Sequence, residues 1–280
     1  MTEKVDYSRE SLLKMDPSPL RAMIRERAHH TVEIQLYEAL AEGRTLPAGT
    51  GSTVRQMLEL WRERGLPTDG PDFAWVNKLL ELADQSVRGE KVDLSAFAWH
   101  QHTEEEYALI RRLIHQRRAV RHWTGQEVPD WMIDEILEAG RWAPHGCNMN
   151  SVRFIVVHEA KEPGLFKGAD VPPGPVHIVC VQDSRIYHIQ PGYVAHPYTL
   201  ENNRVLDCGG TMENMVLTAH ALGLGAVWLT FNDAMRQRLA KRFGLGDHMI
   251  IVTFLDVGYP AQTPMAPGRM ALSELVLARV

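Results

Sequence analysis

The chain has 280 residues, of which 45% are hydrophobic and 23% are charged, and its formal net charge is -5 at pH 7. This is the composition of a globular protein with a sizeable core, and the acidic balance argues against a nucleic-acid-binding protein, which would need a broad basic face. No apolar run reaches the roughly 18 residues of a membrane-spanning helix, and the first residues lack the apolar core of a signal peptide, so we expect a cytoplasmic protein.

The cysteines agree with that expectation. The chain has 3 of them, Cys147, Cys180 and Cys208, and so sparse and odd a set fits a reducing compartment better than a disulfide framework. His145 and His177 each lie close to a cysteine in the sequence. No Cys-x-x-Cys pair supports a zinc site, however, so we predict that the protein binds no metal.

Residues 1–100 are predicted to be helical throughout. Apolar residues recur at three- and four-residue spacing within 52–64 and 72–87, and stretches rich in glycine and proline separate these segments. This part of the chain has no strand pattern, repeat or catalytic motif. We therefore predict a helical N-terminal region over residues 1–100, followed by a separate domain over residues 101–280.

An arginine-rich segment follows a predicted helix over 104–116. Residues 117–121 read Arg-Arg-Ala-Val-Arg, at the point where the helical pattern ends. Guanidinium groups present planar donor forks that suit phosphate or carboxylate, so this segment is a candidate anion site. The alternative is a solvated helix end whose positive side chains favour the helix dipole. The segment alone does not decide between the two.

Beyond this segment the pattern becomes mixed. Apolar runs predict strands at 153–158, 176–181, 226–230 and 249–257, and periodic segments predict helices at 128–139, 205–222 and 233–243. Runs that are apolar on both faces are typical of interior strands in a covered sheet. A polar, turn-forming stretch at 143–151 comes directly before the first strand.

Two features of this part call for an explanation. Gly209 and Gly210 lie inside a predicted helix, where each glycine costs about 1 kcal/mol relative to alanine, so we expect another helix or a ligand to approach closely there. The connection over 183–203 is long and carries aromatic residues such as Tyr187, Tyr193 and His196. Such a connection is typical of a functional loop or lid.

No known catalytic constellation is evident. The sequence lacks a nucleophile elbow, paired carboxylates near a strand end and a P-loop, and the glycines within 223–225 end a helix rather than open one. Arginines and amide side chains that suit an anion, without an evident acid, base or nucleophile, indicate that a bound cofactor carries the chemistry. We therefore predict no catalytic side chain.

Five segments together resemble the FMN-dependent nitroreductase superfamily over roughly residues 105–280. In the superfamily's order and spacing, they are Arg117-Arg118-Ala119-Val120-Arg121, Ala143-Pro144 through Asn148 and Asn150 to Arg153-Phe154, Asp207 to Gly225, Gly258-Tyr259-Pro260, and Pro267-Gly268-Arg269. The resemblance implies an α+β fold in which helices wrap a central, mainly antiparallel sheet. It also implies an obligate homodimer with FMN at the subunit interface.

The resemblance carries a set of cofactor contacts onto this chain. The arginine segment and the C-terminal arginine would bind the phosphate, the ribityl chain and the pyrimidine edge of FMN, and the loop before the first strand would contact the flavin. The residues that match the superfamily's FMN contacts are Arg117, Arg118, Ala119, Arg121, Pro144, His145, Asn148, Asn150, Trp228, Leu229, Thr230 and Arg269. Thr230 is a candidate donor to flavin N5, where a donor would stabilise reduced flavin, and is otherwise an ordinary strand residue.

The chain departs from the superfamily pattern in several places. Ala119 replaces the usual serine, which removes one hydroxyl contact, and Asn150-Ser151-Val152 replaces the usual Gln-Pro-Trp, which changes the pocket wall. The connection over 159–175 is short, so a helical excursion found in many relatives is absent. Relatives also lack a helical N-terminal region of this size. We expect that region to pack near the flavin and to shape the substrate pocket.

The function that the resemblance implies is electron transfer from NADH or NADPH through FMN to a small, planar, electron-poor substrate. Nitroaromatics, quinones, activated alkenes and halophenols are all candidates, and the sequence does not choose among them. One alternative is a flavin-dependent dehydrogenase or oxidase of a biosynthetic pathway, or an enzyme that consumes flavin. Another is a non-catalytic flavin-binding module that acts through its N-terminal helices.

Overall fold

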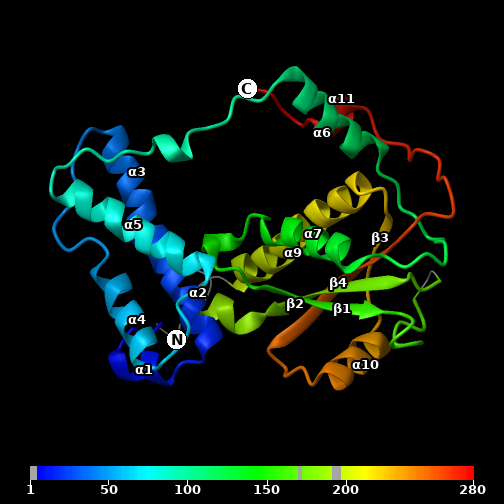
Figure 1. The fold of residues 1–280 in the computed structure, drawn as a ribbon, viewed down its shortest axis with the longest axis horizontal. Coiled ribbons are helices and arrows are strands. Elements are labelled where there is room, and N and C mark those ends of the chain that lie inside the picture. The colour runs from blue at the N-terminus through cyan, green and yellow to red at the C-terminus, as the bar shows by residue number, and fades with distance from the viewer. Residues whose placement is uncertain (1–4, 170–171, 191–196) are drawn as a thin grey trace.

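The computed structural model describes residues 5–169, 172–190 and 197–280, with the side chains of residues 197–201 left out. Figure 1 shows two bodies, a bundle of helices built from the N-terminal residues and a larger α+β body that holds the sheet. The α+β class predicted from the sequence is confirmed.

The N-terminal region is helical, as predicted. Its elements are α1 (Arg9–Lys14), α2 (Pro17–Ala28), the π-helical turn η1 (His29–Glu33), α3 (Ile34–Ala41), α4 (Ser52–Glu63), α5 (Pro71–Val87) and the short 3-10 turn η2 (Ser95–Phe97). Proline opens both α2 and α5, where its missing N–H has no helical partner to lose. The apolar faces of these helices pack together into one core.

The sheet has four strands in the order β1-β2-β4-β3, and every neighbouring pair is antiparallel. Its strands are β1 (Val152–His158), β2 (Val176–Asp183), β3 (Gly225–Leu229) and β4 (Met249–Gly258). All four predicted strands are confirmed within one or two residues at their ends. Thr230 was placed inside the third strand by the sequence pattern, but β3 ends at Leu229 and Thr230 follows it.

Helices cover both faces of the sheet. On one face lie α7 (Asp130–Arg141) and α9 (Pro197–Ala221), which pack against each other, and on the other lies α10 (Asp233–Phe243). Alternate residues of β2 serve the two faces: Ile178 is buried on the α7 and α9 side, and Val179 is buried on the α10 side. This double covering explains why the strands read as continuous apolar runs.

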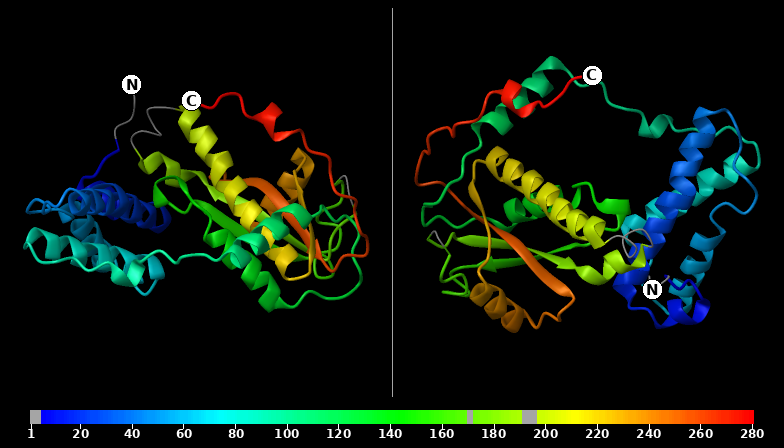
Figure 2. Two further views of the ribbon diagram at one scale, coloured as in Figure 1. Left: turned by 90° about the horizontal axis from the view of Figure 1, so that it is seen from above. Right: turned by 180° about the vertical axis from the view of Figure 1, so that it is seen from behind.

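The two bodies share a core. The cluster formed by the N-terminal helices also includes Met149, which follows the 3-10 turn η3 (Gly146–Asn148), and Ile186, Tyr187 and Ile189 of the 3-10 segment η4 (Ser184–Ile189). Figure 2 shows the N-terminal helices against the end of the sheet where β1 begins and β2 ends. The boundary at residue 100 therefore divides the chain but not its hydrophobic core.

Two segments extend away from the α+β body. Helix α6 (Glu104–Gln116) begins with a capping box between Thr103 and Glu106 and has no buried residue. The tail after β4 is exposed over most of its length and holds only the short helix α11 (Leu272–Leu275). Both lie along the upper edge of Figure 1. Within the described residues, no helix has the length and apolar character needed to cross a membrane.

Candidate functional site

The arginine segment is fixed against the start of β3. The backbone N–H of Val120 donates to the carbonyl oxygen of Ala226 at 3.0 Å, and Ala119 pairs with the same residue as an isolated parallel bridge. Val120 is buried, and a Cβ atom added to Gly225 would lie 2.7 Å from its Cγ1 atom. Glycine at position 225 therefore lets the two segments approach closely enough to pair.

The arginine side chains of this segment have no acidic partner in the part of the chain that the structure describes. Among the described residues, no carboxylate forms an ion pair with Arg117, Arg118 or Arg121. Burial lowers the pKa of His220, near the end of α9, and the positive charges of Arg117 and Arg118 lower it further. The first two arginines therefore lie close to this end of α9. Arg121 lines a surface hollow together with Glu159 and Pro175.

The loop before β1 is held in an unusual backbone conformation. Cys147, Asn148 and Asn150 have φ angles of 51°, 53° and 53°, in the left-handed region that side chains other than glycine rarely adopt. The N–H of Gly146 donates to Asp207 Oδ1 at 2.9 Å, which ties the loop to α9. Arg25 of α2 donates to the loop's carbonyl oxygens from the other side.

A buried polar network lies beneath this loop. Asp207 accepts hydrogen bonds from the Tyr187 hydroxyl and from Ser151 Oγ, and Gln182 Nε2 donates to the Tyr187 oxygen at 2.7 Å. Burial alone would raise the pKa of Asp207, but nearby His145, the Tyr187 hydroxyl and the Gly146 N–H together lower it. Burial and the Asp207 charge raise the pKa of Tyr187. The network therefore favours an ionised Asp207 beside a neutral tyrosine.

Two members of this network have a buried polar atom without a hydrogen-bond partner among the described residues, Gln182 at Oε1 and His145 at Nδ1. The Nδ1 atom of His145 lies 3.8 Å from Asp207 Oδ2, longer than an ordinary hydrogen bond, and the His145 side chain is only 5% exposed. A buried polar atom left in this way normally awaits a water molecule or a ligand.

The end of β3 presents an aromatic side chain. Trp228 is 43% exposed, yet its indole Nε1 atom donates to Thr253 Oγ1 at 2.6 Å, so the ring is held in place. Thr253 in turn donates to the carbonyl oxygen of Leu229 at 2.5 Å. Thr230 is exposed just beyond the strand. The Trp228 ring and the Thr230 side chain are accessible to a ligand, whereas the Leu229 carbonyl already accepts a hydrogen bond.

Among the described residues, no atom closely approaches the two adjacent glycines of α9. The predicted close approach of another helix is therefore wrong. A Cβ atom added to Gly209 would lie 4.0 Å from the Trp228 ring, and one added to Gly210 would lie 3.8 Å from Pro144 Cδ. These are ordinary van der Waals distances, so alanine would fit at both positions in the chain alone. Packing between helices therefore does not account for the glycines, and the ligand remains as the predicted explanation.

The last predicted contact, Arg269, lies apart from the others. It is exposed in the tail, and its guanidinium donates to the neighbouring Gly268 carbonyl at 2.8 Å. The start of the tail is anchored where the N–H of Ala261 donates to the carbonyl of His122 at 3.0 Å. The structure records no contact between Arg269 and the arginine segment in the same chain.

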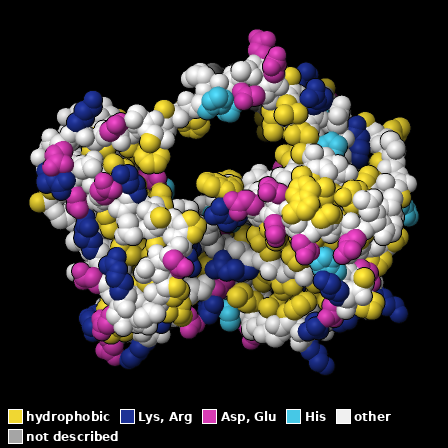
Figure 3. Space-filling view, in the orientation of Figure 1, with side chains coloured by type: hydrophobic (Ala, Val, Ile, Leu, Met, Phe, Trp, Pro, Cys, Tyr) yellow, Lys and Arg dark blue, Asp and Glu magenta, His cyan; other side chains and the backbone are white. Residues whose placement is uncertain are grey.

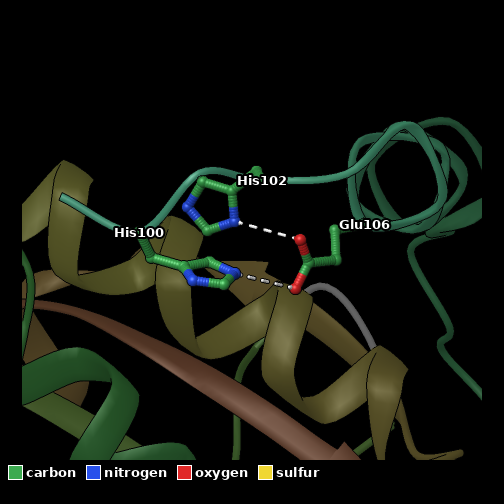
Figure 4. Close-up of side chains that lie close together, drawn as sticks. All are labelled: His100, His102 and Glu106. Carbon is green, nitrogen blue, oxygen red and sulfur yellow. Dashed lines mark ion pairs between the residues drawn. The ribbon is translucent and has the colours of Figure 1, made fainter.

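One group of described residues has the spacing of metal ligands. Candidate ligand atoms of His100 and His102, in the connection before α6, and of Glu106, in the first turn of α6, all lie within 4.8 Å of one another (Figure 4). All three side chains are exposed, and Glu106 Oε2 already accepts the Thr103 N–H of the capping box at 2.8 Å. We do not include this group in the candidate site, which lies around β3 and α9.

Sequence reasoning missed several residues that build this site. The sequence analysis did not single out Arg25, Asp207, Tyr187 and Thr253 as the residues that are buried and hydrogen-bonded beneath the predicted contacts. Arg25 and Glu26 were the one available signal, as charged residues inside a buried helical stretch. The predicted aromatic lid was wrong for Tyr187, which is buried, and Tyr193 and His196 lie outside the described residues.

Comparison with known proteins gave concordant matches. The family model described as Nitroreductase family matches residues 114–170 and 175–259. A protein of Methanothermobacter thermautotrophicus named as an NADH dehydrogenase/NAD(P)H nitroreductase is 33% identical over 163 residues, covering 55% of this chain and 79% of the relative. An NADH dehydrogenase of Thermus thermophilus is 27% identical over 192 residues, covering 59% and 93% of the two chains.

Solved structures match over the same part of the fold. A nitroreductase family protein of Streptococcus pneumoniae superposes with a TM-score of 0.53 at 20% identity, covering 61% of this chain and 100% of the other. A nitroreductase family protein of Clostridium difficile gives a TM-score of 0.51 at 24% identity, covering 60% and 97% of the two chains. The match to the family model leaves out residues 1–113.

Proposed function

The chain belongs to the nitroreductase family, and from this premise we propose that it is an FMN-dependent oxidoreductase driven by NADH or NADPH. The names of its relatives, which include NADH dehydrogenase and NAD(P)H nitroreductase, support an oxidoreductase of this type. The observation that carries the cofactor assignment is the arginine segment. Its three guanidinium groups have no acidic partner among the described residues, and a backbone hydrogen bond fixes the segment to β3.

The residues present fit the chemistry of FMN, which combines a phosphate with a flat ring system. Arg117, Arg118 and Arg121 would hold the phosphate and polar edge, since unpaired guanidinium groups favour such anions. The half-exposed Trp228 ring and the space beside Gly209 suit a flat aromatic group. These residues therefore suit both the phosphate and the flavin ring of the cofactor.

Bound FMN would supply the electron acceptance and donation that no side chain of this chain can supply. The polypeptide would bind and orient FMN and would polarise the flavin. Asp207, whose pKa its donors lower, would supply a negative charge beneath the loop, 3.8 Å from His145 Nδ1. The Thr230 hydroxyl would serve as a hydrogen-bond donor at the end of β3, and the amides of Asn148 and Asn150 would line the opposite wall.

The distance between the two groups of contacts favours a site shared by two copies of the chain. Arg117 and Arg118 lie by His220, whereas His145 lies by Asp207, 13 positions earlier on α9. At 1.5 Å per residue, these positions are about 20 Å apart along the helix. We therefore propose a homodimer in which the arginine segment of one copy faces the loop before β1 of the other.

The exposed arm formed by α6 and the tail after β4 supports the same arrangement. Ile110 and Ile114 of α6 are 47% and 52% exposed, and apolar residues continue along the tail, where Leu277 is 98% exposed. Figure 3 shows hydrophobic side chains open to solvent on this arm. Contiguous apolar surface of this kind marks an interface, and a second copy would cover it while bringing Arg269 to the partner's flavin.

The dimer can be tested by sedimentation of the purified protein. The double variant Ile110→Glu/Ile114→Glu should sediment as a monomer and lose FMN. Ile34→Glu is the matched control, because Ile34 is also exposed, at 45%, but lies on the N-terminal helices. A wild-type monomer that retains FMN would contradict the shared site.

The cofactor and the direction of electron flow can be tested together. The absorption spectrum of the purified protein should show flavin bands that bleach on anaerobic mixing with NADH or NADPH, and should recover with nitroaromatics, quinones, activated alkenes or halophenols. Flavin bands that do not bleach would indicate a dehydrogenase, an oxidase, a flavin-consuming enzyme or a non-catalytic module. A protein that remains colourless with added FMN would refute the cofactor assignment.

Charge-removing variants identify the residues involved. Arg117→Gln/Arg118→Gln should weaken FMN binding at least tenfold, since two of the proposed phosphate contacts are lost. Arg44→Gln/Arg88→Gln, which removes the same charge from exposed positions of the N-terminal helical region, is the control. Equal loss in both variants would mean that the effect is one of general charge.

A further inference from the structure

The N-terminal helical region contacts the loop of residues 144–150 through one buried arginine. Arg25 of α2 is 6% exposed, and its Nη2 atom donates to the carbonyl of Met149 at 2.5 Å. Its Nε atom donates to the carbonyl of Asn148 at 3.3 Å. A single guanidinium, 123 positions away in sequence, thereby bonds two consecutive carbonyls of the loop proposed to contact FMN.

The guanidinium is held by a carboxylate from another N-terminal helix. Asp72 of α5 accepts from Arg25 Nη1 at 2.8 Å and from Arg21 Nη2 at 2.5 Å. Burial lowers the pKa of Arg25, and the bond to Asp72 opposes this effect, so the buried cation depends on its counterion. The geometry of α2 and α5 together therefore fixes where the Arg25 donors lie.

The loop needs such an external restraint. Three of its residues, Cys147, Asn148 and Asn150, have left-handed backbone conformations, which are strained for residues with side chains unless the surroundings compensate. Asn150 Nδ2 donates to the Asn148 carbonyl at 3.0 Å from within the loop. The Met149 carbonyl, in contrast, is held by Arg25 from outside it. Without Arg25 this buried carbonyl would lose its partner, and relaxation of the loop would be favoured.

We propose that Arg25 is a positioning residue for the flavin site and that the N-terminal helical region acts on the reaction through it. This inference rests on the proposed FMN-dependent function and deepens it. Arg25 acts by holding the backbone carbonyls of Asn148 and Met149. The orientation of the Asn148 amide toward the flavin would then depend on residues that the family match does not include.

A matched pair of arginines separates positioning from mere stability. Arg21 shares the same carboxylate as Arg25 but makes no hydrogen bond to the loop, and its side chain is 37% exposed. Arg21→Met therefore removes one ion pair of Asp72 and leaves the loop contacts intact. Arg25→Met removes both the ion pair and the two loop contacts. Arg25→Lys keeps the charge but lacks the planar fork that spans two carbonyls.

The experiment measures FMN affinity and the two-electron potential of bound FMN in the intact wild-type protein and the three variants. Arg25→Met should weaken FMN binding at least tenfold and shift the potential, whereas Arg21→Met should change affinity less than twofold and leave the potential in place. Arg25→Lys should lie between them. If a variant weakens the affinity for oxidised FMN tenfold more than the affinity for reduced FMN, or the reverse, the potential shifts by about 30 mV.

Stability measurements keep the test decisive. Urea unfolding of the same samples establishes that each variant is folded, and if Arg25→Met is not, Arg25→Lys carries the comparison. The inference is overturned if the Arg25 variants bind FMN with the wild-type affinity and potential, or if Arg21→Met shows the same changes. A wild-type protein that binds no FMN would instead refute the proposed function, which is a distinguishable result.

Discussion

The ion pairs of Asp72 should dominate the acid stability of the N-terminal region. Burial alone would raise the pKa of Asp72, but the hydrogen bonds from Arg21 and Arg25 outweigh it and lower the pKa from 3.8 to about 2. At roughly 1.4 kcal/mol per pKa unit, ionised Asp72 contributes about 2 kcal/mol to folding at neutral pH. Asp72→Asn also leaves Arg25 buried without a counterion, so we expect a total loss of about 3 kcal/mol.

The pH dependence of this loss follows from the sign of the shift. The pKa of Asp72 is lower in the folded chain than in the unfolded chain, so its stabilisation is complete above about pH 5 and is lost as the pH falls toward 2. About half of it should be gone by pH 3. The stabilities of wild type and Asp72→Asn should therefore converge on acidification.

Urea unfolding followed by circular dichroism between pH 3 and pH 7 measures both effects. Asp84→Asn is the control, because the Arg55–Asp84 pair has side chains that are 39% and 46% exposed, and its loss should cost less than about 1 kcal/mol. The reasoning would be refuted if the two variants were equally destabilised at pH 7, or if the Asp72→Asn difference did not shrink at pH 3.

Three further changes test other parts of the site. Gly225→Ala should destabilise the protein by about 1–3 kcal/mol and weaken FMN binding, because its Cβ atom would lie 2.7 Å from Val120. Tyr187→Phe removes a donor that lowers the pKa of Asp207, so that pKa should rise and the acid limb of the stability profile should move to higher pH. Thr253→Val removes the hydrogen bond to the Trp228 indole and should change the tryptophan emission.

Each of these changes has a control. Gly125→Ala adds a Cβ atom that meets no neighbour within 4 Å, so it should leave stability and FMN affinity within experimental error. Tyr37→Phe alters a tyrosine that is 46% exposed and should not move the acid limb. Thr253→Ser, which retains the hydroxyl, should keep the wild-type emission. An effect of equal size in a control would contradict the corresponding contact.

The sequence pattern identified the strands because burial there is periodic, but α9 begins at Pro197, within the predicted connection over 183–203 and eight residues before the predicted helix start at 205. In β2, the apolar residues from Val176 to Val181 alternate between the helix layers on the two faces of the sheet, so a continuous apolar run identified the strand and its covered sheet. The resemblance to the superfamily located the arginine segment from the order and spacing of residues along the chain. The family model also matches this segment, whereas the pairing of the segment with β3 is a long-range contact between Val120 and Ala226.

The remaining features depend on contacts that local pattern does not encode. Arg25 and Met149 are far apart in the chain, and nothing near either residue indicates that they meet. The end of β3 before Thr230 depends on where β4 stops pairing with it, at Leu229 opposite Phe254. The place of Arg269 depends on more than one copy of the chain, if the proposed dimer is correct. Sequence reasoning supplied the predicted contacts of the candidate site but not the long-range interactions that hold them in place.

The shared core also determines what happens when the polypeptide is cut. The connection between α5 and α6 is exposed over most of residues 89–103, so a protease has access to it. Because Met149, Ile186 and Tyr187 pack among the N-terminal helices, the two fragments would remain bound after cleavage, and the nicked protein would elute from a sizing column as one species. Genetic removal of the same helices would leave those side chains facing water. Loss of activity on truncation would then report a collapsed surface rather than a missing catalytic contribution.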